Sequence, residues 1–380
     1  MSVPSIESSP LFVPWRDPVS GVESLILDRR VAPLQQSFYY VSPSFSADGR
    51  FFWIYCGFPP SGNANQGRSL AVVDFQLQEI RHYPETGFLD ASPVVDSATG
   101  EAYWCSGLEV WKRGPLASDH PVLVNRFPAA LARNRRPWRI ATHLTFSADR
   151  RALNFDAEIG RQWFAGHFPL DGGEPAVWRE FDRPYNHGQF SPADPDLQLI
   201  NQDSAIDPVT GDSPNYENRM WLLHRYGTAK PIFPDAAASG AAKHGHEWWA
   251  DDGRHVWYIH YNRGVMRVDP FRSPAQPELI WPSDTVSHAH ASADETGVVA
   301  DYIPGPATGI NKVSFLNRRT GREAVIVSQA PYPPEDLRRY HVHSHPRFCL
   351  GDRYICYTTT VRGRVDVALV SVDSLLARTA

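Results

Sequence analysis

The stretch HEWWADDGRHVWYI, residues 246–259, shows the unit that decides the fold of this chain. A short apolar run leads into a turn at Asp252-Gly253, and a strand rich in aromatic residues follows. An Asp-Gly pair between two β-rich runs is a hairpin signal. The pattern x-x-F-S-x-D-G, followed by such a strand, occurs seven times. The other six copies are SPSFSADGRFFWIY from Ser42, SPVVDSATGEAYW from Ser92, HLTFSADRRALNF from His143, HGQFSPADPDLQLI from His187, HAHASADETGVVAD from His288 and HPRFCLGDRYICY from His345.

The spacing of the copies predicts an all-β fold, a seven-bladed β-propeller. Successive copies begin 42 to 59 residues apart, and repeats of about 40–50 residues with several strands each are typical of propeller blades. The last copy leaves room for only three strands, so we expect Glu23–Asp28 (ESLILD) to complete the seventh blade and close the ring. No linker separates the copies, which predicts a single domain over residues 1–380. Two packed β-domains are the alternative.

The composition and charge limit the class of protein and the cellular location that we expect. The 380 residues have a net charge of −5, which excludes a generally basic nucleic-acid binder. No apolar stretch reaches membrane-spanning length, and no secretory signal is visible. Four cysteines without metal-type spacing (Cys56, Cys105, Cys349 and Cys356) favour reduced thiols and a cytoplasmic location. The basic cluster RNRRPWR, residues 133–139, could line a mouth for an anionic ligand. The oligomeric state is not indicated.

Histidine occupies the first position of five copies: His143, His187, His246, His288 and His345. In a propeller the innermost strand of each blade lines the central channel, so these residues should lie at one rim. A single histidine would more simply be a packing residue. Five in register favour a shared site for metal binding, proton transfer or both.

The histidines are densest near the end of the chain. His341, His343 and His345 alternate in a stretch that we expect to be extended, so they should share one strand face. Two earlier pairs alternate in the same way: His288 with His290, and His244 with His246. Imidazoles from the sixth and seventh blades can provide a nitrogen-rich site for a divalent cation. Ligand type alone does not separate zinc, manganese, iron and nickel.

The motifs HEWWADDG, HAHASADE and HVHSHPRFCLGD, with RMW at Arg219, resemble the oligogalacturonate lyase family. That resemblance implies a seven-bladed propeller that cleaves pectin-derived oligogalacturonides by β-elimination with manganese. His288, His343 and His345 match the family's metal-binding histidines. His246 matches the histidine that takes the proton, and Arg219 matches the arginine at the substrate carboxylate.

The chain departs from the family pattern at one ligand. A glutamine ligand is expected a few residues before the last histidine pair, where this chain has Arg339-Tyr340-His341. Either His341 replaces the amide, or the fourth protein ligand is missing. An imidazole there could change the metal preference. Manganese is the first candidate, and zinc or another divalent metal is the alternative.

The same residues fit the chemistry of β-elimination at a uronate. A divalent cation and Arg219 can stabilise negative charge on the carboxylate, and a neutral His246 can abstract the C5 proton. Several further residues are expected to contact the anionic oligosaccharide. His187, Gln189 and His143 would complete the rim, Tyr185 and His244 are candidate acids for the leaving oxygen, and Trp248 could stack on a sugar.

Other functions fit the sequence as well. The chain could be a propeller lyase for another uronate, in ulvan-like chains that contain glucuronate or iduronate. It could be a non-catalytic propeller that binds a protein or peptide at its rim. A metal-dependent hydrolase would need a metal-bound water, and its product would lack the 4,5-unsaturation.

Overall fold

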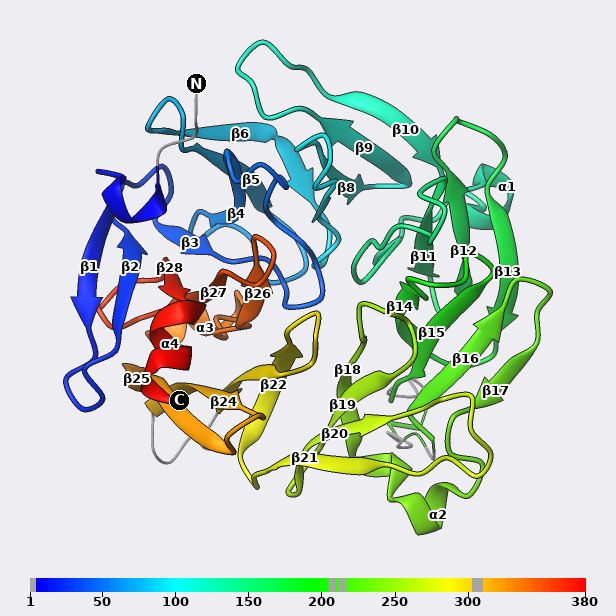
Figure 1. Cartoon of the computed structure of the whole chain (residues 1–380). Coiled ribbons are helices and arrows are strands. Elements are labelled where there is room, and N and C mark those ends of the chain that lie inside the picture. Colours follow the sequence, from blue (N-terminus) through cyan, green and yellow to red (C-terminus); the bar gives the residue numbers. More distant parts are fainter. Residues whose placement is uncertain (1–4, 205–209, 212–215, 217, 303–309) are drawn as a thin grey trace.

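Seven antiparallel sheets are arranged in a ring around a central axis (Figure 1). The computed structural model describes residues 5–204, 210–211, 216, 218–302 and 310–380. Six of the sheets are built from consecutive segments of the chain, and the seventh joins the two ends of the chain. The predicted seven-bladed β-propeller is therefore confirmed. We number the blades 1 to 7 from the sheet that contains residue 34.

The strands of each blade run from the axis outward. Blade 1 has β3 (Leu34–Gln36), β4 (Phe51–Gly57), β5 (Arg68–Asp74) and β6 (Glu79–Phe88). Blade 2 has β7 (Val94–Val95), β8 (Ala102–Ser106), β9 (Glu109–Arg113) and β10 (Val122–Arg126). Blade 3 has β11 (Ala152–Glu158), β12 (Trp163–Pro169) and β13 (Ala176–Phe181). Blade 4 has β14 (Tyr185–Phe190), β15 (Leu197–Gln202), β16 (Met220–His224) and β17 (Ala229–Pro231).

The remaining blades follow the same plan. Blade 5 has β18 (His244–Trp249), β19 (Val256–His260), β20 (Gly264–Val268) and β21 (Glu278–Pro282). Blade 6 has β22 (Val286–Ala291), β23 (Gly297–Tyr302), β24 (Ile310–Asn317) and β25 (Arg322–Pro331). Blade 7 has β26 (Arg347–Cys349), β27 (Tyr354–Thr359), β28 (Asp366–Ser371), β2 (Glu23–Leu27) and β1 (Phe12–Arg16). The helices are short: η1 (Ile6–Ser8), α1 (Ala129–Ala132), α2 (Ala236–Ser239), η2 (Ala241–Lys243), α3 (Glu335–Arg338) and α4 (Val372–Arg378).

The repeated Ser-x-Asp-Gly sequence closes the first hairpin of a blade. In blade 1 the Ser46 hydroxyl donates to Asp48 at 2.6 Å and accepts from the Phe51 backbone N–H at 2.9 Å. Gly49 has a φ of 74°, a left-handed conformation that glycine adopts without a steric penalty. The corresponding serines of two later copies make the same pair of hydrogen bonds: Ser147 and Ser292. The motif therefore fixes the turn between the first two strands of a copy.

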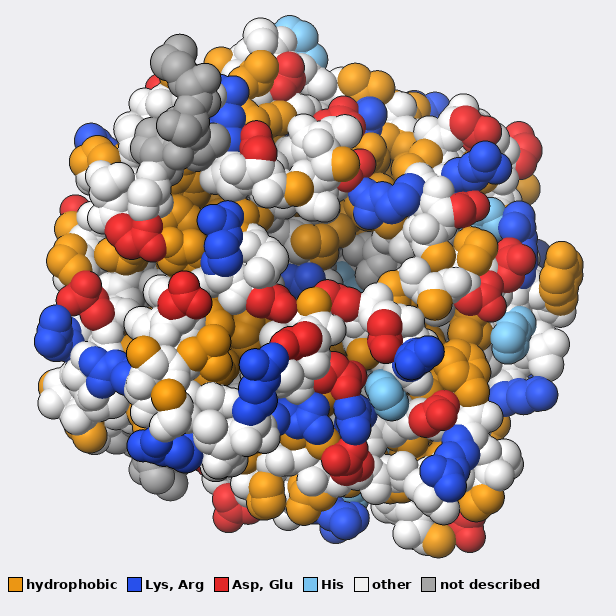
Figure 2. Space-filling model, in the orientation of Figure 1, with side chains coloured by type: hydrophobic (Ala, Val, Ile, Leu, Met, Phe, Trp, Pro, Cys, Tyr) orange, Lys and Arg blue, Asp and Glu red, His pale blue; other side chains and the backbone are white. Residues whose placement is uncertain are grey.

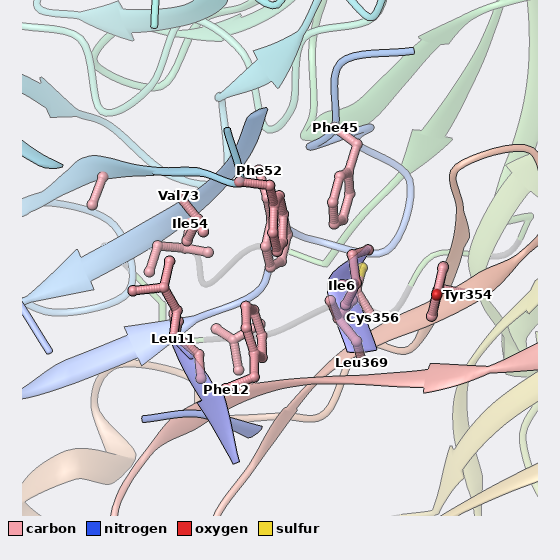
Figure 3. Packing of buried hydrophobic residues seen from close by; sticks show 14 of the residues in the cluster. Ile6, Leu11, Phe12, Phe45, Phe52, Ile54, Val73, Tyr354, Cys356 and Leu369 are labelled. Carbon is pink, nitrogen blue, oxygen red and sulfur yellow. The ribbon is translucent and has the colours of Figure 1, made fainter. Parts of the chain in front are cut away.

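The N-terminal segment closes the ring as predicted. Strand β2 pairs with β28, with Ile26 opposite Ala368, and β1 adds a fifth, outermost strand that the sequence analysis did not predict. Figure 3 shows the apolar cluster behind this closure, in which N-terminal residues meet side chains of blades 1 and 7. Within it Phe45 stacks on Phe52 with ring centroids 4.1 Å apart. The core thus lies between neighbouring blades, as expected of a propeller.

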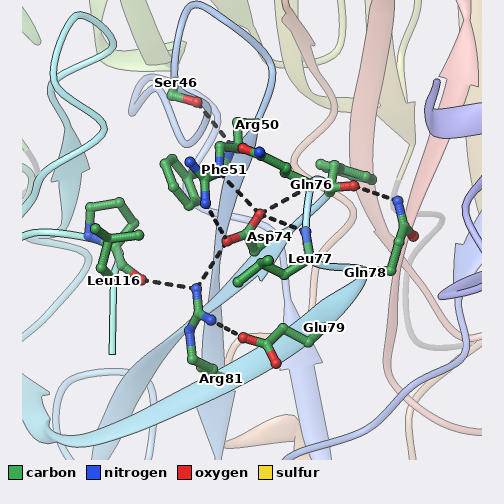
Figure 4. A network of polar contacts seen from close by, with 12 residues as sticks. Ser46, Arg50, Phe51, Asp74, Gln76, Leu77, Gln78, Glu79, Arg81 and Leu116 are labelled. Atoms are coloured by element: carbon green, nitrogen blue, oxygen red, sulfur yellow. Dashed lines mark hydrogen bonds and ion pairs between the residues drawn. The ribbon is translucent and has the colours of Figure 1, made fainter. Parts of the chain in front are cut away.

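A buried carboxylate ties together the strands of blade 1 (Figure 4). Asp74, at the end of β5, accepts hydrogen bonds from Arg50 at 3.1 and 3.2 Å and from Arg81 at 3.1 Å. Burial opposes ionisation of Asp74, but the arginines and two backbone N–H groups outweigh it and hold its pKa below the ordinary value.

Two further expectations concern cysteines and membranes. The four cysteines are free thiols, as predicted. In the described part of the chain no helix has the length and apolarity needed to cross a membrane.

Candidate metal centre and its cavity

The ring is hollowed at its centre in the space-filling view (Figure 2). A cavity of about 820 Å³, its mouth included, lies among the inner strands and the loops joined to them. Its wall includes histidines from three blades: His187, His246, His341 and His345. Of the five histidines at the repeat position, His187, His246 and His345 therefore reach this central cavity.

Four histidines meet at one point beside this cavity. One ring nitrogen from each of them lies within 4.8 Å of the others: His288, His341, His343 and His345. These are the four residues that the sequence analysis selected as metal ligands. His288 belongs to β22 in blade 6, and the other three belong to the segment before β26 in blade 7.

The donor atoms of this cluster are suited to a cation. Nε2 of His288, Nδ1 of His343 and Nε2 of His345 are buried and have no hydrogen-bond partner among the described residues. A buried polar atom without a partner costs about 1–3 kcal/mol. Burial also holds the pKa values of His288 and His345 well below the ordinary value, so both rings are neutral and have a lone pair to offer. The residues present therefore fit a divalent transition metal.

Asp301 on β23 holds two of these histidines in place. Its carboxylate accepts a hydrogen bond from Nδ1–H of His288 at 3.0 Å and from the backbone N–H of the same residue at 2.8 Å. It also accepts from the backbone N–H of His345 at 3.0 Å. With Nδ1 protonated, Nε2 of His288 is left as the ligand nitrogen. A carboxylate behind a histidine in this way is a common outer support of metal sites.

The polypeptide adopts an unusual conformation where the repeated histidines occur. His187, His246 and His345 have φ values of 51°, 49° and 43°, which are uncommon for residues other than glycine. In blades 4 and 5 the inner strand also shifts register there, between Asn186 and Gln189 and between Gly245 and Trp248. Such bulges redirect side chains and recur next to active sites.

These kinks correct two sequence predictions about shared strand faces. His341, His343 and His345 are not in an extended strand, because β26 begins only at Arg347 and His341 has a φ of 54°. They converge because the loop folds back, with the His343 N–H donating to the His341 carbonyl at 3.0 Å. His244 and His246 do not share a face either: the bulge begins after Gly245 and includes His246. His244 packs on Tyr258, whereas His246 lines the cavity.

His246 lies beside the cluster and lines the cavity. Its ring centroid is 4.1 Å from that of His288. Nδ1–H donates to the backbone carbonyl of Ser287, which leaves Nε2 as the nitrogen with the lone pair. Burial lowers the pKa of His246 to about 4, and the positive charge of Arg219 adds to the shift. At neutral pH the side chain is therefore uncharged and able to accept a proton.

Arg219 is buried and held by two carboxylates. Its guanidinium lies 3.2 Å from Asp203 and 3.4 Å from Glu247, and it donates to the Gln202 carbonyl at 3.3 Å. Burial opposes its charge, but Glu247 and Asp203 outweigh burial and raise its pKa. Arg219 is absent from the residues that line the described cavity, so its effect there is electrostatic.

The predicted rim residues differ in their access to the cavity. His187 lines it. His143 is fully buried, with its ring 5.5 Å from that of His187 and 5.6 Å from that of Tyr39. Gln189 is buried and donates to the Glu247 carbonyl at 2.8 Å. Only His187 of these three is therefore placed to touch a ligand directly.

Three predicted substrate contacts lie in the hydrophobic core. Tyr185 stacks on Phe181 between blades 3 and 4, and Trp248 stacks on Trp257 in another core cluster. His244 is fully buried against Tyr258. The structure does not bring these three side chains to the cavity, because they pack within and between the blades.

Several residues of the site are not marked by any motif in the sequence. Tyr39 lines the cavity, and its ring lies 4.9 Å from that of His345. It precedes the first copy, outside the repeat, and only the doublet Tyr39-Tyr40 signals it. Arg68 and Asp301 begin or lie within ordinary strands, so no motif distinguishes them.

Comparison with known proteins agrees with this architecture, although no family model matches the chain. A curated relative, the oligogalacturonate lyase of Dickeya dadantii (strain 3937), is 23% identical over 219 residues, which cover 53% of this chain and 54% of the relative. The match thus spans about half of each protein. A solved structure of oligogalacturonate lyase in complex with manganese aligns with a TM-score of 0.74 at 16% identity, over 95% of this chain and 96% of the other.

A second solved structure gives the same result. An oligogalacturonate lyase from Vibrio parahaemolyticus aligns with a TM-score of 0.73 at 16% identity, over 95% of this chain and 96% of that protein. The resemblance to oligogalacturonate lyases, predicted from the motifs, is therefore confirmed in sequence and in fold.

Proposed function

We propose that the chain is a divalent-metal-dependent lyase that cleaves short uronate oligosaccharides, oligogalacturonides first, by β-elimination. The product would carry a 4,5-unsaturated uronate at its new end. The observation that supports this most directly is the juxtaposition of His246 with the four-histidine cluster in one cavity. The similarity to oligogalacturonate lyases supports the choice of substrate.

His288, His341, His343 and His345 would hold the metal ion. When bound, a divalent cation would stabilise negative charge on the substrate carboxylate. Four imidazoles favour a transition metal over magnesium or calcium. Manganese is the first candidate because a similar protein has been solved in complex with it, and zinc is the second.

His246 would act as the general base on the C5 proton of the sugar. Its neutral state supplies the lone pair, and its hydrogen bond to Ser287 directs Nε2 rather than Nδ1 at the substrate. Burial lowers the pKa of His246, and the charge of Arg219 adds to this effect, so His246 is unprotonated before the reaction. The same charge would favour the negative carboxylate as the proton leaves.

Ultraviolet absorbance of the conjugated 4,5-unsaturated uronate tests this proposal. Purified protein is mixed with digalacturonate in the presence of manganese and, separately, after treatment with a chelator. We expect absorbance to rise only with metal. A panel with glucuronate- and iduronate-containing oligosaccharides identifies the preferred uronate. No unsaturated product from any uronate, with manganese or zinc supplied, would refute the proposal.

A further inference from the structure

The cavity has a second charged wall that the proposed chemistry does not use. The histidines of the metal site and His246 come from blades 5, 6 and 7. Two arginines that line the same cavity come from another sector of the ring. Arg68 begins β5 in blade 1, and Arg139 precedes β11 of blade 3.

Arg68 is a buried cation without a carboxylate partner. Its exposed fraction is 6%, and no carboxylate oxygen of the described residues lies within 4.0 Å of its guanidinium. The guanidinium lies over the ring of Tyr55, 4.8 Å from the centroid. Its terminal nitrogens donate to the backbone carbonyls of Ala64 and of Asp90, the latter at 2.8 Å. The carboxylate of Asp90 acts on this charge only from beyond 4.0 Å. A desolvated charge whose hydrogen-bond partners are all neutral is costly unless an anion joins it.

The described charged residues near Arg68 form no ion pair with it, so its guanidinium can bind an anionic ligand. Arg139 pairs with Glu158 at 3.0 Å, so its charge is already compensated. Asp90 also lines the cavity, but its side chain forms no ion pair with either arginine within 4.0 Å. Besides the two backbone carbonyls, the amide oxygen of Gln36 lies 3.5 Å from Arg68.

Gln36 connects this wall to the metal-site loop. Its amide nitrogen donates to the His341 carbonyl at 3.2 Å, while its amide oxygen faces Arg68. The separation between the histidine cluster and Arg68 is thereby fixed by a chain of hydrogen bonds. Two anion-attracting centres at a fixed separation in one cavity suit a ligand with two carboxylates.

We infer that Arg68 binds the carboxylate of a second uronate residue, next to the one at the histidine cluster. This inference rests on the proposed function and makes it more specific: the substrate must carry carboxylates on two adjacent sugars. Arg139, already paired with Glu158, lines the same wall. A guanidinium suits this task because it can donate to both oxygens of a carboxylate.

Calorimetry tests the inference by changing the ligand while Arg68 stays in place. The His246→Ala protein, loaded with manganese, binds sugar without cleaving it. It is titrated with digalacturonate and with each of its two monomethyl esters. We expect the diacid to bind about 10- to 100-fold more tightly than either ester, because each ester loses one charge-assisted contact. An ester that binds as tightly as the diacid would overturn the inference.

Variants of Arg68 assign the effect to this residue. In Arg68→Gln we expect the advantage of the diacid over the esters to fall to about threefold or less, and Arg68→Lys should restore part of it. Arg113→Gln is the matched control. Arg113, at the end of β9 in blade 2, is also buried, lies over the ring of Tyr83 in blade 1 and does not line the cavity. If Arg68→Gln does not fold, the test rests on the binding of the diacid and the esters to the His246→Ala protein.

The two proposals fail in different ways. Absence of unsaturated product from the unchanged protein, with binding of the diacid intact, refutes the lyase and leaves the subsite standing. Cleavage that proceeds equally well on the esters and on the diacid refutes the subsite and leaves the lyase standing. Absence of binding to diacid and esters alike refutes both.

Discussion

Replacing Asp301 by asparagine should weaken metal binding without unfolding the protein. The carboxylate accepts hydrogen bonds from the ring and backbone of His288 and from the backbone of His345 at 2.8–3.0 Å. In Asp301→Asn one oxygen becomes an NH2 group that faces a donor. One charge-assisted hydrogen bond of about 1.5–3 kcal/mol is lost. We therefore expect the dissociation constant for manganese to rise about 10- to 100-fold, as is typical for such outer supports.

Competition of the protein with a fluorescent chelator for manganese measures this change. Circular dichroism of the metal-free variant checks that it is folded. Asp74→Asn is the matched control, because Asp74 is equally buried but belongs to the arginine network of blade 1 (Figure 4). It should lower stability and leave metal affinity unchanged. A folded Asp301→Asn protein that binds manganese within twofold of the unchanged protein would contradict the reasoning.

Four further predictions follow from the same structure. His341→Gln should shift metal preference from zinc towards manganese, because an amide oxygen replaces an imidazole; competition between the two ions measures it. His246→Asn should lower kcat about 10²- to 10⁴-fold while manganese affinity stays unchanged, and loss of both together would contradict the assigned role. Phe52→Ala should reduce the free energy of unfolding by about 3–5 kcal/mol, because its fully buried ring stacks on Phe45 within the apolar cluster of blades 1 and 7; urea unfolding tests this. The pKa of Asp74 is lowered by folding, so its stabilisation should be present above the unfolded pKa of about 3.9 and lost as pH falls below it; the Asp74→Asn protein should lack this part of the acid dependence.

The sequence alone was sufficient for the architecture and for the identity of the candidate ligands. The Ser-x-Asp-Gly turn and the strand after it are local signals, so their repetition predicted seven blades. The count of strands after His345 predicted that Glu23–Asp28 would close the ring. His288 and His345 stood out because a packing role does not require the same titratable residue in register. His343 was added because it matches a metal-binding histidine of the family, and His341 because it stands where the family has a glutamine ligand.

Only the tertiary structure decided which side chains reach the cavity. The left-handed conformations at His187, His246 and His345 break the strand alternation on which the sequence prediction relied, and they separate His244 from His246. Trp248 lies in the core, where it stacks on Trp257 of its own blade and on His290 of blade 6. Asp301 and Arg68 join the site through contacts between blades that are distant in sequence. Local patterns do not encode such contacts, because they depend on how the closed ring brings separate blades together around its axis.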